Sequence, residues 1–115
     1  MVDSLIQQQI GQMEAYLRER KIILIKEQDG SALSKIIFFH YPRSGRGKDI
    51  GQAVYDPVQG VITVNFYFGR GNARFRQAIA EPLEALVQEG IDPLDDAIMQ
   101  PLYRLSADLA LEHLC

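Results

Sequence analysis

The N-terminal segment places its apolar side chains at the spacing of an amphipathic helix. Residues three or four positions apart share one face of a helix, and a surface helix buries that face. In the segment 4–20 the shared positions are occupied by Leu5, Ile6, Ile10, Met13, Tyr16 and Leu17. Asp3 precedes the segment, where a carboxylate can accept hydrogen bonds from the first free backbone N–H groups. The pattern predicts a helix over 4–20 with Asp3 as its N-cap.

Two segments rich in β-branched and aromatic residues follow, at 21–27 and 34–41. Asp29-Gly30 between them is a strong turn signal, so the two segments are predicted to pair as an antiparallel hairpin. Each segment is apolar at four successive positions, Ile22–Ile25 in the first and Ile36–Phe39 in the second. A strand that is apolar on both sides needs cover on both faces of its sheet. The face away from the N-terminal helix therefore needs a second helix layer or a second subunit, and we expect a homodimer.

Two further strands are predicted, joined by the turn residues 56–60, Asp-Pro-Val-Gln-Gly. The third strand lies within 49–56. The fourth alternates between two faces, with Ile62, Val64, Phe66 and Phe68 on one and Thr63, Asn65 and Tyr67 on the other. Because a period of two is typical of a half-buried strand, Phe66 and Phe68 are predicted to be core residues and Tyr67 to be exposed. The four strands in succession predict an antiparallel meander.

The segment 73–89 is predicted to be helical but interrupted. Pro82 lacks a backbone N–H and crowds the preceding turn, which predicts a kink or two shorter helices with Pro82 in the first turn of the second. Gly90 then suits the left-handed position that ends a helix.

The remaining residues are predicted to be helical as well. Asp92-Pro93 has the form of an N-cap followed by proline at the first helical position. Pro101 is expected to interrupt this segment, leaving a final helix over 102–114. The elements together predict a single α+β domain over 1–115, a four-stranded antiparallel meander with an N-terminal helix and a C-terminal helical segment (α-β-β-β-β-α-α).

Composition narrows the class of protein. Apolar residues make up 47% and charged residues 23% of the chain, which is typical of a globular domain. The single cysteine, Cys115, allows no disulfide within the chain and no cysteine metal cluster. The longest apolar runs have four residues, whereas a membrane helix needs about 20. The N-terminal residues also lack the basic-then-apolar layout of a signal peptide. We therefore expect a cytoplasmic protein with no membrane partner and no cofactor.

Charge is distributed unevenly along the chain. From Lys35 to Arg76 there are seven basic residues and two acidic ones, a net charge of +5. From Gln77 to the end there are eight acidic residues and one basic one, a net charge of −7. Such polarity can steer a charged partner. The alternatives are that both blocks only keep the protein in solution, or that they attract each other across a subunit contact.

Two glycine-rich basic loops, 43–48 and 69–72, are the best candidates for an anion site. Glycines let a backbone approach an anion closely, arginines bind phosphate through two hydrogen bonds, and Asn72 is placed to cap the helix that follows. Neither loop has the spacing of a P-loop or of a dinucleotide-binding fingerprint. The candidate anion-binding residues are Arg43, Arg46, Lys48, Arg70, Asn72, Arg74 and Arg76. In a meander both loops leave the same end of the sheet, so they are predicted to lie close together.

Support for catalysis is weaker. The set that could serve a metal-independent ribonuclease is His40 with Tyr41, Arg43 and Lys48. A polar end of an apolar strand is the simpler interpretation of His40. Neither His40 nor His113 belongs to a metal-ligand spacing, and the acidic residues of 92–96 are explained by the dipole of the helix that they begin. We therefore assign no catalytic and no metal-binding residue.

These observations favour a small non-catalytic binding or regulatory protein that acts through protein–protein contact and forms a homodimer. Its interface would be the acidic C-terminal surface or the sheet face. An inhibitor or immunity-like protein that covers a basic nuclease site is one example, by analogy of charge alone. The alternative is binding of nucleic acid or another polyanion through the basic loops 43–48 and 70–76. A third hypothesis is a metal-independent enzyme that uses His40.

Overall fold

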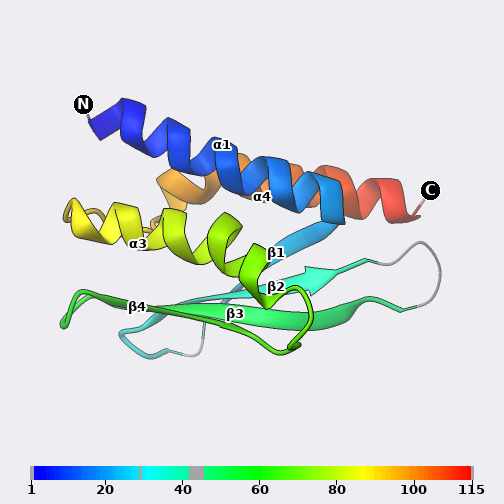
Figure 1. The fold of residues 1–115 in the computed structure, drawn as a ribbon, viewed down its shortest axis with the longest axis horizontal. Coiled ribbons are helices and arrows are strands. Elements are labelled where there is room, and N and C mark those ends of the chain that lie inside the picture. Colours follow the sequence, from blue (N-terminus) through cyan, green and yellow to red (C-terminus); the bar gives the residue numbers. More distant parts are fainter. Residues whose placement is uncertain (1, 29, 42–45, 115) are drawn as a thin grey trace.

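The computed structural model describes residues 2–28, 30–41 and 46–114, and it confirms the predicted α+β fold (Figure 1). Four strands form one sheet in the order β1-β2-β3-β4, and each neighbouring pair is antiparallel. None of the helices within these ranges is long and apolar enough to cross a membrane. The elements are α1 (Val2–Arg20), β1 (Ile22–Glu27), β2 (Ser34–His40), β3 (Lys48–Asp56), β4 (Val61–Phe66), α2 (Asn72–Phe75), the π-helix η1 (Arg76–Ala80), α3 (Glu81–Gln88) and α4 (Asp96–Leu114).

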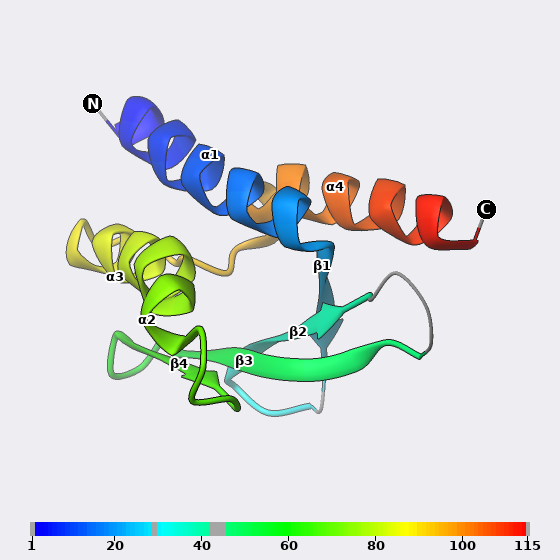
Figure 2. The same ribbon diagram turned by 45° about the vertical axis from the view of Figure 1, so that its right-hand side comes forward.

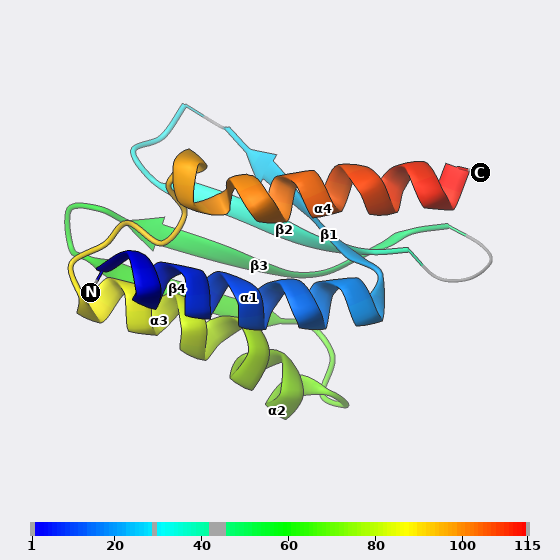
Figure 3. The same ribbon diagram turned by 90° about the horizontal axis from the view of Figure 1, so that it is seen from above.

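All of these helices lie on one face of the sheet (Figures 1 and 2). Seen from above, α1 runs between α4 and the α2–α3 segment (Figure 3). The opposite face carries no helix from the described part of the chain. Of the two kinds of cover predicted for that face, a second helix layer is therefore wrong, and a second subunit remains.

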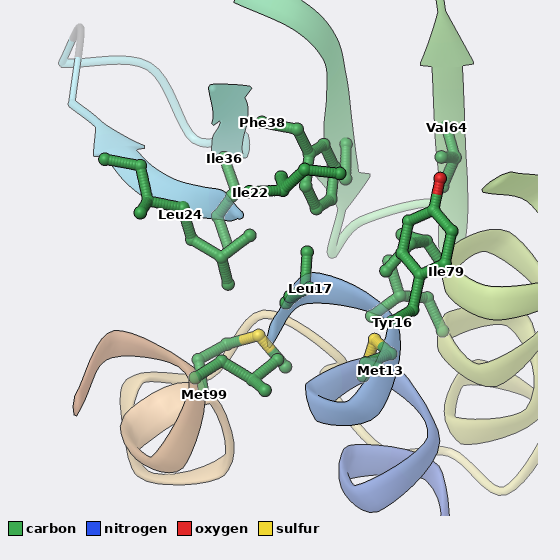
Figure 4. Close-up of a cluster of buried hydrophobic side chains, with 14 of the residues drawn as sticks. Met13, Tyr16, Leu17, Ile22, Leu24, Ile36, Phe38, Val64, Ile79 and Met99 are labelled. Carbon is green, nitrogen blue, oxygen red and sulfur yellow. The ribbon is translucent and has the colours of Figure 1, made fainter. Parts of the chain in front are cut away.

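The core lies between the sheet and the helices (Figure 4). Alternate residues of the strands point into it, among them Leu24, Ile36 and Val64. Met13 and Leu17 reach it from α1, and the exposed fractions of their side chains are 2% and 0%. The predicted alternation of β4 is confirmed, because the residues of its polar face are exposed. Apolar positions of one strand face and one helix stripe meet, as the two periodicities require.

The interruption at Pro82 is also confirmed. Pro82 lies in the first turn of α3, and the five residues before α3 form the π-helix η1. There the backbone N–H of Glu81 donates to the carbonyl of Arg76, five residues earlier. A proline ring collides with the carbonyl four residues before it, so a wider turn at this point relieves the crowding. Gly90, with a φ of +75°, ends α3 as predicted.

Two predicted helix starts are wrong. α1 begins at Val2, so Asp3 lies inside the helix and is not its N-cap. α4 begins at Asp96, because Asp92 forms a turn by accepting a hydrogen bond from Leu94 N at 3.0 Å. The carboxylate of Asp95 takes the capping role, accepting from Ala97 N at 3.2 Å.

Pro101 does not interrupt the C-terminal helix, contrary to prediction, because α4 continues through it. The ring is exposed, and a proline near the beginning of a helix removes a single hydrogen bond. Met99 and Leu102 on either side are each only 1% exposed. The burial of these neighbours against the core offsets the lost bond.

Helix α4 also covers the free edge of β1. The N–H of Leu24 points away from β2 and donates to Ser106 Oγ at 2.9 Å. The Ser106 hydroxyl in turn donates to Leu102 O at 2.8 Å. Farther along, Lys26 Nζ lies 2.7 Å from an Asp96 carboxylate oxygen. The backbone N–H of Leu24, which would otherwise be unpaired at the edge of the sheet, is thus hydrogen-bonded to a side chain of α4.

Replacing Ser106 by alanine is therefore expected to lower the free energy of unfolding by about 1–2 kcal/mol, because the buried N–H of Leu24 loses its acceptor. Urea unfolding followed by circular dichroism measures the change. Ser4→Ala, at an exposed position of α1, is the matched control and should change stability by less than about 0.5 kcal/mol. Equal stability of the two variants would show that the hydrogen bond from Leu24 N to Ser106 does not stabilise the fold.

Candidate functional site

The two basic loops leave the same end of the sheet, as the meander predicts (Figure 1). The Nζ atom of Lys48, at the start of β3, lies 4.5 Å from the ring centroid of Phe68, just after β4. The segment between β4 and the second loop is tied to β3 as well, since Tyr67 N donates to Ile50 O at 3.0 Å. Lys48, the last residue of the first loop, is therefore held beside the residues that precede the second loop by strand pairing and by a cation–π contact.

Four of the predicted anion-binding residues are exposed at this end, namely Arg46, Lys48, Arg70 and Arg74. No ion pair neutralises any of them within the described ranges. Arg43 lies outside the described residues. Unpaired cations at one end of a small domain raise the local concentration of anions there. Whether these residues bind an anion stays a prediction.

Arg76 and Asn72 differ from the other candidates. Arg76 Nη1 donates to the carbonyl of Val64 at 3.4 Å, and its Nη2 lies 3.7 Å from a carboxylate oxygen of Glu84. Its guanidinium is thus directed along the edge of β4. Asn72 does not cap α2, because the N-cap position is Gly71, with a φ of +86° and no side-chain hydrogen bond. Glycine adopts this left-handed conformation without strain, so the helix begins one residue earlier than predicted.

The C-terminal end of α1 adds a cation that sequence reasoning missed. The Cζ atom of Arg20 lies 5.7 Å from the ring centroid of Tyr16. The same tyrosine lines a groove of about 270 Å³ together with Glu19 of α1 and Arg74 of α2. Burial raises the pKa of Tyr16 above its ordinary value, against the charges of Arg20 and Arg74. The sequence signal was the basic cluster at residues 18–21.

A second feature that sequence reasoning missed is a cavity of about 170 Å³ between β1, β2 and the start of α4. It is lined by Lys26, Asp96 and Tyr103, among others. The Tyr103 hydroxyl is buried and has no hydrogen-bond partner in the described part of the chain. Burial and the nearby charge of Asp96 raise the pKa of Tyr103 to about 12. The hydroxyl therefore stays protonated and can act as a donor at neutral pH.

The acidic residues at the start of α4 have structural partners. Asp92 and Asp95 accept backbone hydrogen bonds, and Asp96 binds Lys26. In the described ranges no three His, Cys, Asp or Glu side chains gather in a way that would hold a metal ion. His40 lies opposite Ile22 and Lys48 in the sheet. The imidazole of His113 stacks on Tyr41 with 4.3 Å between ring centroids, which connects the end of α4 to the end of β2.

The uncovered sheet face has an apolar half, on β1 and β2, and a polar half, on β3 and β4. Strand alternation and register put Ile25 and Ile37 on it as direct neighbours in β1 and β2. Ile25 is 41% exposed, and Ile37 and Phe39 are only partly buried. The β3 and β4 half presents polar residues of the same rows, including Asn65.

The chain was compared with known protein families, with curated proteins and with solved structures. None of the three searches found a match.

Proposed function

We propose that this protein is a non-catalytic binding protein that acts through protein–protein contact, and that a second copy of the chain docks on its uncovered sheet face. The observation that carries the proposal is the apolar half of that face, formed by Ile25, Ile37 and Phe39 of β1 and β2. Neighbouring apolar side chains that stay wholly or partly exposed on a sheet are typical of an interaction surface. The polar half supplies groups for hydrogen bonds around it.

Contact between faces is favoured over pairing between sheet edges. At the β1 edge, Ser106 of α4 already accepts the hydrogen bond that Leu24 N would offer to another strand. At the β4 edge, Arg76 donates to Val64 O and places a charged side chain along the strand. Both devices oppose the addition of a strand from another molecule. A partner therefore has better access to the face.

The charge distribution favours a second copy as the partner. Lys48 begins β3 towards one end of the long axis, and the acidic α3–α4 connection, residues 89–95, lies at the other end (Figures 1 and 3). In a two-fold dimer with antiparallel long axes, the basic end of each copy approaches the acidic end of the other. A parallel arrangement would bring like charges together. The dimer is therefore expected to be antiparallel.

The alternative interface, the acidic surface of the C-terminal helices, has fewer free carboxylates than the sequence implies. Asp96 pairs with Lys26 at 2.7 Å, and Glu112 pairs with Lys21 at 3.4 Å. Both pairs fasten α4 to β1 and to the turn before it. Carboxylates that already have a cationic partner within the chain are less available to a basic protein, and this favours the sheet face as the interface.

Sedimentation velocity tests the proposal. The unmodified protein is expected to form a dimer at micromolar concentration, and Ile25→Glu should weaken dimerisation by about tenfold or more, because a charge would be buried without a partner. Val58→Glu makes the same chemical change in the β3–β4 turn, at a side chain that is 86% exposed, and should leave the dimer intact. A monomer at every concentration, or equal effects of the two variants, would refute docking on this face.

A further inference from the structure

The groove at Tyr16 lies between α1 and the α2–η1 segment, which run beside each other on the helix side of the sheet (Figure 3). Its volume is about 270 Å³. The small side chains of Ala15 on α1 and Ala78 on η1 line it and leave room between the two segments. Of the lining residues, all of which the structure describes, only Tyr16 is buried, with 9% of its surface exposed. Tyr16 therefore forms the bottom of the groove.

The hydroxyl of Tyr16 is a hydrogen-bond donor that the fold does not use. In the described part of the chain it has no hydrogen-bond partner. Burial raises the pKa of Tyr16, although the positive charges of Arg20 and Arg74 oppose the shift. The phenol therefore stays protonated at neutral pH and can donate to a group that binds beside it.

Two arginines without an internal ion pair act at the same tyrosine. Arg74 lines the groove, and the Cζ atom of Arg20 lies 5.7 Å from the centroid of the Tyr16 ring. Neither of them forms an ion pair among the residues that the structure describes. Arg18, by contrast, is paired with Glu14 at 2.9 Å. The charges of Arg20 and Arg74 thus remain available to a ligand.

The balance of charge indicates which class of ligand fits. Glu19 lines the groove as well, so one negative charge opposes the two arginines and the net charge beside Tyr16 is +1. A singly charged anion suits this balance better than a doubly charged phosphate. A guanidinium can hold a carboxylate through two parallel hydrogen bonds, and a phenol can donate a third. The volume equals that of about nine water molecules, which suits a small molecule.

We propose that the groove between α1 and the α2–η1 segment binds a small organic carboxylate, with Arg74 and Tyr16 as its direct donors and Arg20 as a nearby positive charge. This site is a function beyond the docking of a second copy and does not depend on it, because the helices and the uncovered face lie on opposite sides of the sheet (Figures 1 and 2). Since solvent reaches the arginines, we expect a dissociation constant in the millimolar range that rises with salt.

Titration with lactate, followed by two-dimensional NMR of the backbone amides, tests this proposal. The amide signals of residues 74–78 and of the facing part of α1 should shift and saturate. Lactamide, which has nearly the same shape without the charge, should bind at least about tenfold more weakly. No saturable shift at the groove, or equal affinities for lactate and lactamide, would overturn the proposal. Tighter binding of inorganic phosphate than of lactate would overturn the assignment of a carboxylate.

Two substitutions test the donors. Arg74→Gln should weaken lactate binding by about tenfold, because it removes a charged donor. Arg104→Gln is the matched control, since it makes the same change at an exposed residue of α4 outside the groove, and its effect should stay within about twofold. Tyr16→Phe should weaken binding by about fivefold without loss of stability, because the hydroxyl has no internal partner. Equal affinities of the two arginine variants, or an unchanged affinity of Tyr16→Phe, would contradict the proposed contacts.

A third substitution tests the place of binding. Ala15→Leu fills the groove from an exposed position of α1 and should abolish lactate binding while the helix persists. Ala107→Leu makes the same change at an exposed position of α4 outside the groove and should leave binding intact. Circular dichroism of both variants checks the fold. Retained binding in a folded Ala15→Leu variant would show that lactate does not occupy the groove.

Discussion

Replacing Phe75 by alanine is expected to lower the free energy of unfolding by about 3–5 kcal/mol, the largest effect that we predict for this protein. The side chain is 0% exposed. Its ring stacks on Phe66 with 4.7 Å between centroids and meets the edge or face of Phe38 at 5.2 Å and of Tyr16 at 6.2 Å. One ring thus connects α2 with β4, β2 and α1. Its removal leaves a cavity that four elements would have to close together.

Chemical unfolding of the Phe75→Ala variant, with the slope of the transition compared with that of the unmodified protein, measures this loss. Phe75→Leu keeps most of the volume and should lose only about 1–2 kcal/mol. Phe68→Ala is the control for loss of a phenylalanine at the sheet end, where the side chain is only partly buried, and should cost less than Phe75→Ala. A loss below about 1 kcal/mol for Phe75→Ala would contradict the central place of this ring.

Replacing Gly51 by alanine is expected to lower the free energy of unfolding by about 3 kcal/mol. A Cβ atom at this position would stand 2.4 Å from the carbonyl oxygen of Asn65 on β4. Both groups belong to paired strands, so neither can turn aside as a flexible side chain would. Gly51 also pairs with Phe38, where the register between β2 and β3 shifts. Glycine at a strand irregularity permits the close approach of a neighbouring backbone.

Gly11→Ala is the matched control for Gly51→Ala. A Cβ atom at position 11, in the middle of α1, would meet nothing within 4 Å. Because alanine is a better helix former than glycine, Gly11→Ala should raise the free energy of unfolding by about 0.5–1 kcal/mol. Thermal and urea unfolding should therefore move the two variants in opposite directions. If Gly51→Ala unfolded at the same denaturant concentration as the unmodified protein, the close approach of β3 and β4 would be wrong.

The errors of sequence reasoning have a common physical cause. Asp3, Asn72 and Asp92 were each a good N-cap by residue type, yet none of them caps its helix. Several residues in a row were competent to cap, and the choice among them costs only about 1 kcal/mol. The burial of the residues that follow is worth more, so packing sets the first turn. Pro101 follows the same rule, since the buried Met99 and Leu102 keep α4 helical through it.

Some residues of the candidate sites could likewise be found from the sequence, and others could not. Arg46, Lys48, Arg70 and Arg74 were found from charge and glycine spacing, and the meander brings their two loops to one end as predicted. Arg20 was not found, because it lies in neither glycine-rich loop; it lies over Tyr16, which shares a groove with the distant residue Arg74. Arg76 was counted with the free cations, although the carbonyl of Val64 and the carboxylate of Glu84 occupy it. Charge is visible in a sequence, but its neutralisation by distant residues is not.

By itself, the sequence determined the order and type of the elements, because hydrophobic periods of two and of 3.6 residues and the turn residues between them are local properties. It also determined which residues enter the core, since the same periods show which residues share the buried face of each element. Only the tertiary structure decided that all helices cover one face of the sheet, that Ser106 satisfies the edge of β1, and which cations remain unpaired. These features depend on contacts between distant segments, whose energies are set by packing and desolvation in three dimensions. The uncovered sheet face, on which the proposed binding function rests, belongs to this second group.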